Sequence, residues 1–126
     1  MRLLVVDDNE DITDMIRYYC IKGNIECEVT NNGIEALDKL RHEQFDLVLL
    51  DLAMPTFSGV DVIRTLKKDG LLESMNIAII TASPDKTILE EMKNSGVKTI
   101  LSKPCSVDEL TDLINKYRDL WFIFNM

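Results

Sequence analysis

Several short apolar runs of this 126-residue chain end in a side chain that can do chemistry. These side chains are three carboxylates, a hydroxyl and an ammonium, supplied by Asp7, Asp8, Asp51, Thr81 and Lys103. The preceding runs cover residues 2–6, 47–50, 77–80 and 99–102. If the runs are parallel strands of one sheet, the five groups emerge along the same edge. Two carboxylates about 4 Å apart repel by roughly 1 kcal/mol in water and by about 4 kcal/mol at an effective dielectric of 20, so this edge requires a cation.

Such an edge suits magnesium-dependent phosphoryl transfer. Mg²⁺ binds hard oxygen ligands and retains several waters where carboxylates are few. A carboxylate beside Mg²⁺ can attack phosphorus and form an aspartyl phosphate. The transferring oxygens then need a metal ion, an ammonium and a hydroxyl donor. Each residue alone has an ordinary interpretation as a cap, a turn or a surface charge, and the prediction depends on their combination.

Length and composition limit the remaining classes. A chain of 126 residues with 46% hydrophobic and 29% charged residues is typical of one globular domain. No apolar stretch approaches the roughly 18 residues of a membrane span, and the N-terminus meets acid too early for a signal peptide, so we expect a cytoplasmic protein. A net charge of −8 argues against nucleic acid as a direct ligand. Cys20, Cys27 and Cys105 lack metal-ligand spacing and are interpreted as reduced thiols.

Stretches of helical period separate the apolar runs. Asn9 or Asp11 can cap a first helix, and a second helix begins near residues 32–33. Residues 25–29 alternate as another strand, and a third helix ends at residues 69–70. Residues 83–85 open a fourth helix, and Ser106 with Glu109 forms a capping box for a fifth. The inward positions expected for these helices include Ile12, Ile16, Ile34, Leu37, Ile63, Leu66, Val107, Leu110 and Ile114. Strand and helix alternate five times, which predicts an α/β fold: a parallel sheet with helices on both faces.

Taken together, the pair at residues 7–8, the stretch Asp51 to Gly59, Thr81-Ala82 and Lys103-Pro104 resemble the receiver domain of two-component response regulators. The resemblance covers about residues 2–117 and points to the stand-alone, chemotaxis-regulator-like form. It implies a flavodoxin-like five-stranded sheet of order 2-1-3-4-5 and a phosphoryl group accepted by Asp51 from a phosphohistidine. The donor would be a histidine kinase or a phosphotransfer protein, and a downstream protein would read the signal.

The resemblance also implies the role of each site residue. Asp8, Asp51 and the Ala53 carbonyl would bind Mg²⁺, and Asp7 would assist through water. Thr81 and Lys103 would bind the phosphoryl oxygens, and the bond between Lys103 and Pro104 is commonly cis in the family. The protein would catalyse only its own phosphorylation and dephosphorylation, and in that sense it is not an enzyme.

Three positions depart from the family pattern or modulate it. Ile100 stands where the family usually has Tyr or Phe, and Cys105 stands where it often has Phe. Ile100 can therefore act as a smaller switch or simply pack. Ala53 and Ser83 occupy positions that influence dephosphorylation and carry no amide or acid to orient water, so we expect a phosphoryl group that is not unusually short-lived.

Two other functions stay open at this point. A receiver-like adapter would keep the fold for protein–protein interaction without phosphorylation, which Ile100 slightly favours. A magnesium-dependent phosphatase would instead need an Asp-x-Asp motif at the first strand, whereas this chain has adjacent Asp7 and Asp8.

An apolar C-terminal segment follows the expected receiver domain. We assign residues 1–119 to the receiver and residues 120–126 to the tail, which contains Leu120, Trp121, Phe122, Ile123 and Phe124. Apolar side chains at a terminus are costly to leave in water. They pack against the domain's own core or against a partner. The hypothesis retained here is a homodimer through the fourth helix, the fifth strand and the fifth helix.

Overall fold

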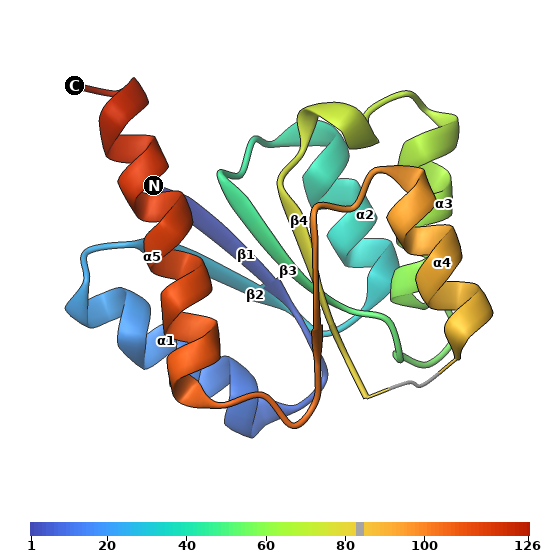
Figure 1. Cartoon of the computed structure of the whole chain (residues 1–126), viewed down its shortest axis with the longest axis horizontal. Helices are drawn as coiled ribbons and strands as arrows, with labels where there is room; N and C mark the ends of the chain where they lie inside the picture. The colour runs from blue at the N-terminus through green and yellow to red at the C-terminus, as the bar shows by residue number, and fades with distance from the viewer. Residues whose placement is uncertain (83–84) are drawn as a thin grey trace.

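A five-stranded parallel sheet forms the centre of the computed structural model, which describes residues 1–82 and 85–126 (Figure 1). The strands are β1 (Arg2–Val6), β2 (Glu26–Thr30), β3 (Leu47–Asp51), β4 (Ile77–Thr81) and β5 (Thr99–Ser102). Their order is β2-β1-β3-β4-β5, and all four pairings are parallel. The α/β fold class and the strand order are confirmed.

Helices cover both faces of the sheet. They are α1 (Glu10–Lys22), α2 (Gly33–His42), α3 (Gly59–Lys68), α4 (Lys86–Ser95) and α5 (Val107–Phe124), with a short 3-10 helix η1 (Leu72–Ser74) before β4. Figure 1 shows α1 and α5 on one face and α2, α3 and α4 on the other.

Each face has its own hydrophobic cluster, because successive strand residues point to opposite sides. Leu4 and Val6 join the cluster under α2, α3 and α4, whereas Leu3 and Val5 join the cluster under α1 and α5. A strand covered on both faces reads as a continuous apolar run rather than an alternating one. This is why the strand runs were visible in the sequence.

Side-chain caps fix where the helices begin. Asn9 rather than Asp11 caps α1, and Asn32 caps α2. Ser106 and Glu109 form the expected capping box of α5. Such caps satisfy backbone N–H groups that have no partner within the helix.

The start of the fourth helix is described from Asp85, which is the N-cap of α4, and the helix begins at Lys86. Ser83 and Pro84 lie outside the described residues. Ile34 and Val107 do not face inward, because 62% and 54% of their surface is exposed. Both lie in the first turn of their helix, where the buried stripe has not yet begun.

The C-terminal tail is helical. The helix α5 continues through Phe124, so the apolar residues after Asp119 form its last turns. Leu120, Phe122, Ile123 and Phe124 are 41–83% exposed. The division into residues 1–119 and 120–126 stays a prediction. Within the described residues, no helix has the length and apolar character needed to cross a membrane.

Candidate functional site

Strand register brings the predicted site residues to one edge of the sheet. Val6 pairs with Leu50, so Asp7 follows beside Asp51. Asp51 in turn pairs with Ile80, which places Thr81 one residue beyond it. Because the strands are parallel, their carboxyl ends share an edge, as the sequence predicted.

Lys103 reaches this edge from β5. Thr81 pairs with Ser102, and the next residue, Lys103, donates its backbone N–H to the Thr81 carbonyl at 2.8 Å. The peptide bond between Lys103 and Pro104 is cis, as the family resemblance implies. Thr81 itself is only 2% exposed.

Three carboxylates gather at the ends of β1 and β3. Asp7 and Asp51 are each only 4% exposed, whereas the neighbouring Asp8 lies open to solvent. One oxygen from each of the three side chains lies within 4.8 Å of the others, so the group can hold a metal ion. These hard oxygen donors fit Mg²⁺, which also retains water on its open side.

The Lys103 ammonium bridges the two buried carboxylates. Its Nζ lies 3.0 Å from Asp7 Oδ2 and 3.3 Å from Asp51 Oδ2. Burial alone lowers the pKa of Lys103, but its hydrogen bond to Asp7 and the negative charges of Asp51 and Asp7 outweigh that effect and raise it. The cation that the converging carboxylates require is therefore supplied by the chain itself.

The surroundings of Asp51 disfavour its charged form. Burial raises its pKa, and the negative charge of Asp7 acts in the same direction. The Ala53 N–H, which donates to Asp51 Oδ1 at 3.1 Å, and the Lys103 ammonium oppose that rise without cancelling it. A second cation beside Asp51 would relieve this cost.

The backbone on both sides of Asp51 is closely packed. The Gly59 N–H donates to the Leu52 carbonyl at 3.1 Å, and a Cβ at Gly59 would lie 2.2 Å from the Asp51 carbonyl oxygen. Ser58 and Asp61 form a capping box there, which starts α3 directly against the site. Only glycine permits this approach.

The turn after Asp51 is held from the other side by α2. A Cβ at Gly33 would lie 2.2 Å from the Phe57 carbonyl oxygen, so the start of α2 also packs on this turn. Between these contacts Thr56 has a φ of 69°, a left-handed conformation that is costly for a β-branched residue. The surrounding packing therefore determines the turn more strongly than the local sequence preference does.

Two positions that depart from the family pattern pack against the hydrophobic clusters. Ile100 packs against the cluster under α2, α3 and α4, and Cys105 packs against the cluster under α1 and α5. Burial raises the pKa of the Cys105 thiol. Ala53 is exposed, and Ser83, the other position expected to influence dephosphorylation, lies outside the described residues.

Sequence reasoning missed two supporting contacts. The Asn9 N–H donates to Asp7 Oδ1 at 2.9 Å, so Asn9 both caps α1 and fixes the buried carboxylate. Its position two residues after an Asp is the signal that predicts such a turn. The approach of Gly59 to Asp51 gave no comparable signal, because it depends on how α3 packs.

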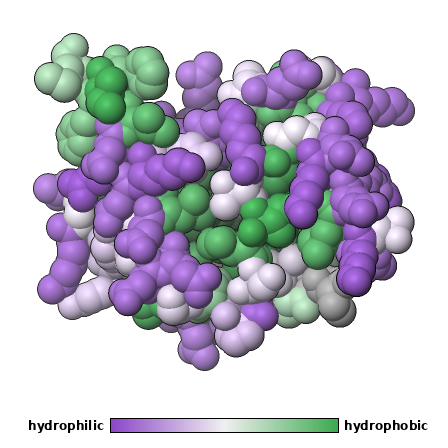
Figure 2. Space-filling view, in the orientation of Figure 1, coloured by the Kyte–Doolittle hydropathy of each residue, from purple (hydrophilic) through white to green (hydrophobic). Residues whose placement is uncertain are grey.

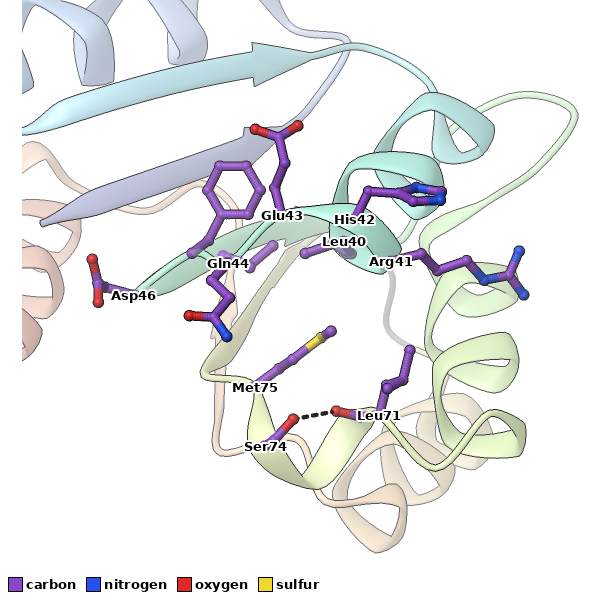
Figure 3. Close-up of a pocket in the computed structure, with 11 residues that line it drawn as sticks. Leu40, Arg41, His42, Glu43, Gln44, Asp46, Leu71, Ser74 and Met75 are labelled. Carbon is purple, nitrogen blue, oxygen red and sulfur yellow. Dashed lines mark hydrogen bonds between the residues drawn. The ribbon is translucent and has the colours of Figure 1, made fainter.

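A cavity of about 480 Å³ lies away from these groups, near the start of β3 (Figure 3). Leu40, Leu71 and Met75 are among its lining residues. The Ser74 hydroxyl there donates to the Leu71 carbonyl, and Arg41 is paired with Asp69 at 2.6 Å. The Ser74 hydroxyl and the Arg41 guanidinium are thus used in contacts within the chain, and the carboxyl edge remains the candidate site.

Two curated bacterial proteins are similar to this chain over nearly their whole length. Sporulation initiation phosphotransferase F of Bacillus subtilis is 31% identical over 119 residues, which cover 94% of this chain and 94% of that protein. The polar-differentiation response regulator DivK of Brucella anthropi is 33% identical over 115 residues, 91% of this chain and 94% of that protein.

Solved structures of response regulators are also similar to this chain. The receiver domain of Francisella response regulator 1452 superposes with a TM-score of 0.81 at 28% identity, covering 94% of this chain and 98% of that one. The Thermotoga maritima response regulator TrrA, solved in complex with Mg²⁺-BeF, has a TM-score of 0.74 at 28% identity, covering 92% and 97%. The response regulator receiver domain family matches residues 3–115, and the chain belongs to this family.

Proposed function

We propose that this receiver accepts a phosphoryl group on Asp51 from the phosphohistidine of a histidine kinase or phosphotransfer protein, in a magnesium-dependent reaction. The observation that carries the proposal is the buried Asp51 carboxylate, which shares one ammonium with Asp7 inside a group of three carboxylates. A buried carboxylate with too little compensating charge gains from metal binding, and beside the metal it can act as a nucleophile toward phosphorus.

Each residue then has a defined part. Asp8, Asp51 and the Ala53 carbonyl would hold Mg²⁺, with Asp7 acting through water. Mg²⁺, when bound, neutralises charge on the carboxylates and on the phosphoryl oxygens. Lys103 and the Thr81 hydroxyl bind phosphoryl oxygens, and the Ala53 N–H positions Asp51. In the described structure Lys103 is directed at the acceptor carboxylate, 3.3 Å away.

The relatives support this chemistry. One is by name a sporulation initiation phosphotransferase, which supports onward transfer of the phosphate as well as signalling. TrrA was solved with Mg²⁺-BeF. Receivers are signalling modules rather than enzymes acting on a separate substrate, so the output here would be a change in binding to a protein partner in the cytoplasm.

Intact mass after incubation with phosphoramidate and Mg²⁺ tests the proposal. The wild type should gain one phosphoryl group, and Asp51→Asn should gain none. Asp112→Asn is the matched control, because Asp112 is an exposed acid of α5 outside the site, and it should label like the wild type. Labelling should also stop when Mg²⁺ is removed with a chelator.

The adapter function makes the opposite prediction. An adapter would gain no mass when incubated with phosphoramidate and Mg²⁺. Its partner would bind the wild type and Asp51→Asn equally. Persistent labelling of Asp51→Asn at another residue would instead contradict the acceptor assignment.

A homodimer through α4, β5, α5 and the tail is also part of the proposal. Figure 2 shows apolar surface at the free end of α5 and between α5 and α4, the face that carries β5. Exposed Phe122, Ile123 and Phe124 supply the first of these areas. Deleting the residues after Asp119 should lower the mass measured by light scattering; an unchanged oligomeric state and unchanged partner binding would remove the tail from the proposal.

A further inference from the structure

Two of the three cysteines of the chain are in contact with each other, far from the phosphorylation site. Cys20 lies in the last turn of α1 and is completely buried, and Cys27 is the second residue of β2 and half-buried. Their thiols interact closely enough for each to shift the pKa of the other. Both are free thiols.

The fold directs both thiols into one layer. The short connection between α1 and β2 is closed by a hydrogen bond from the Ile25 N–H to the Cys20 carbonyl at 2.9 Å. Along β2, Cys27 and Val29 face the cluster under α1 and α5, which contains Cys20. Six residues separate the pair, and the turn brings their side chains together without any distant part of the chain.

The two thiols are chemically unequal. The interaction with the Cys20 thiol lowers the pKa of Cys27, and the positive charge of Arg17 assists, against the effects of burial and of Glu28. The same interaction, together with burial, raises the pKa of Cys20. Cys20 also lies at the C-terminal end of a helix, where a negative charge is unfavourable. One partner is thus the accessible nucleophile, and the other is a buried thiol held against it.

We propose that Cys20 and Cys27 form a thiol–disulfide exchange site that reacts with small-molecule disulfides. The Cys27 thiolate attacks one sulfur of the disulfide RSSR, which gives a mixed disulfide Cys27–S–S–R and releases RS⁻, which takes up a proton. Cys20 then loses its proton and attacks the Cys27 sulfur, which expels the second RS⁻. In total, two protein thiols are oxidised to one disulfide, and RSSR is reduced to two molecules of RSH.

Cys105 provides an internal comparison. It is half-buried like Cys27, but burial and the charge of Glu109 raise its pKa. The exchange chemistry therefore predicts a reaction at Cys27 in preference to Cys105, although the two thiols have similar access.

Peptide mapping of the wild-type protein after exposure to oxidised glutathione tests the site. Tryptic cleavage after Arg17, Lys22 and Lys39 leaves the two cysteines in separate peptides, residues 18–22 and 23–39. After the remaining thiols are blocked, these two peptides should appear linked, the protein should have lost two hydrogens in mass, and Cys105 alone should carry the blocking group. Treatment with dithiothreitol before blocking should restore both thiols, so that all three cysteines then carry the blocking group.

Variants separate the two steps. Cys20→Ala should accumulate a stable glutathione adduct at residue 27, because the resolving thiol is gone, while Cys27→Ala should stay unmodified at residue 20. Cys105→Ser should form the internal disulfide like the wild type. The proposal is wrong if the folded wild type keeps three blocked thiols, if glutathione adds only to Cys105, or if the disulfides found join two chains.

Discussion

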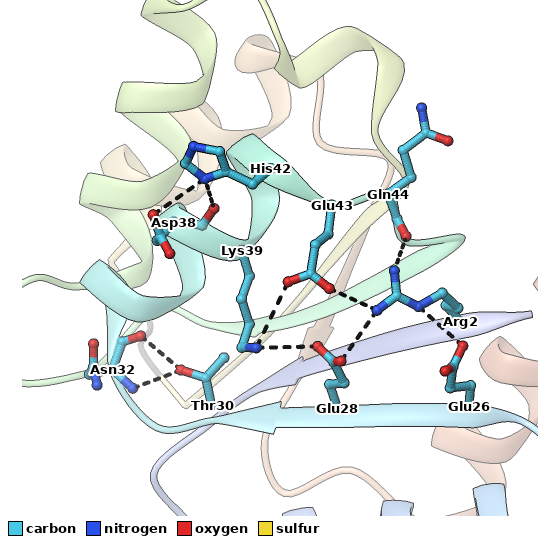
Figure 4. A network of polar contacts seen from close by, with 10 residues as sticks. All are labelled: Arg2, Glu26, Glu28, Thr30, Asn32, Asp38, Lys39, His42, Glu43 and Gln44. Atoms are coloured by element: carbon cyan, nitrogen blue, oxygen red, sulfur yellow. Dashed lines mark hydrogen bonds and ion pairs between the residues drawn. The ribbon is translucent and has the colours of Figure 1, made fainter.

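The two edges of the sheet carry the same motif, a cation shared among carboxylates, in opposite surroundings. At the carboxyl edge Lys103 lies 3.0 Å from Asp7 and 3.3 Å from Asp51. At the amino edge Arg2 is paired at 2.9–3.2 Å with Glu26, Glu28 and Glu43 (Figure 4). If ion pairs alone were counted, the amino edge would be the better candidate for a functional site.

The two edges differ in how far their carboxylates are exposed to solvent. The glutamates at the amino edge are 34–66% exposed, and Lys39 supplies a second cation to Glu28. The aspartates at the carboxyl edge are 4–5% exposed and have only Lys103 between them among the described residues. Accordingly, the hydrogen bond from Arg2 lowers the pKa of Glu43, while burial raises the pKa of Asp51. Water screens the charges of the glutamates at the amino edge. The buried aspartates at the carboxyl edge lack this screening, so their charges must be balanced by Lys103 or by a bound cation.

The largest difference in stability between the two edges should come from replacing a glycine at each of them. Gly59→Ala should lower the free energy of unfolding by about 2–3 kcal/mol, because its Cβ would lie 2.2 Å from the Asp51 carbonyl oxygen. In Gly23→Ala, after the end of α1, the new Cβ would lie 3.2 Å from the end of the flexible Arg118 side chain and at ordinary contact distance from Tyr19 and Ile25. This change should alter stability by less than about 0.5 kcal/mol. Urea unfolding of both variants measures the difference, and equal losses would contradict the packing argument.

Removing each shared cation gives the next contrast. Lys103→Met leaves two buried carboxylates facing each other, and it should cost about 2 kcal/mol at pH 7, less than a fully buried pair because the side chain keeps 17% exposure. Arg2→Met should cost clearly less, because water screens its glutamates. Urea unfolding with a chelator present compares them. A larger loss for Arg2→Met would reverse the comparison.

Replacing the proposed acceptor, Asp51, should stabilise the metal-free protein slightly, whereas the preceding substitutions destabilise it. Folding raises the pKa of Asp51, so its ionisation costs stability above that pKa, and the cost disappears below the unfolded value of about 3.9. Asp51→Asn should therefore raise the metal-free melting temperature by a few degrees, on the scale of about 1 kcal/mol, at pH 7. This advantage should vanish as the pH falls towards about 4. An advantage that grew on acidification would show that the sign is wrong.

The smallest effect concerns the lifetime of the phosphoryl group. Ala53 is exposed beside Asp51 and cannot orient an attacking water, so the phosphorylated protein should lose phosphate over minutes or longer. Ala53→Asn should shorten the half-life several-fold by supplying an amide at that place. Phosphate release after removal of the donor measures both. A half-life of seconds for the wild type would contradict the interpretation of this position.

Sequence reasoning predicted the carboxyl edge well because it depends on local patterns. Parallel strands covered on both faces read as apolar runs, and the residue after each run must emerge at the common edge. Asp7, Asp51, Thr81 and Lys103 were therefore placed correctly without knowledge of any distance. The start of the second helix near residues 32–33 and the capping box that begins at Ser106 were visible for the same local reason.

The remaining features depend on tertiary packing. Adjacent Asp7 and Asp8 differ in burial because the chain turns from β1 into α1 between them. The bridging position of Lys103 depends on how far its side chain extends across β4 to β1. Ile34 had the right period for burial, but it lies in the first turn of α2, beyond the cluster. No periodicity encodes these distances.

Chemical identification of the phosphorylated residue tests the central claim most directly. Borohydride reduces an aspartyl phosphate to homoserine, and tryptic peptide 42–64 contains Asp51, whereas peptide 3–17 contains Asp7 and Asp8. After treatment with phosphoramidate and Mg²⁺, homoserine should appear at position 51 of peptide 42–64 and nowhere else. Homoserine at position 7 or 8, or a phosphate that survives on a serine or threonine, would contradict the assignment of Asp51 as the acceptor.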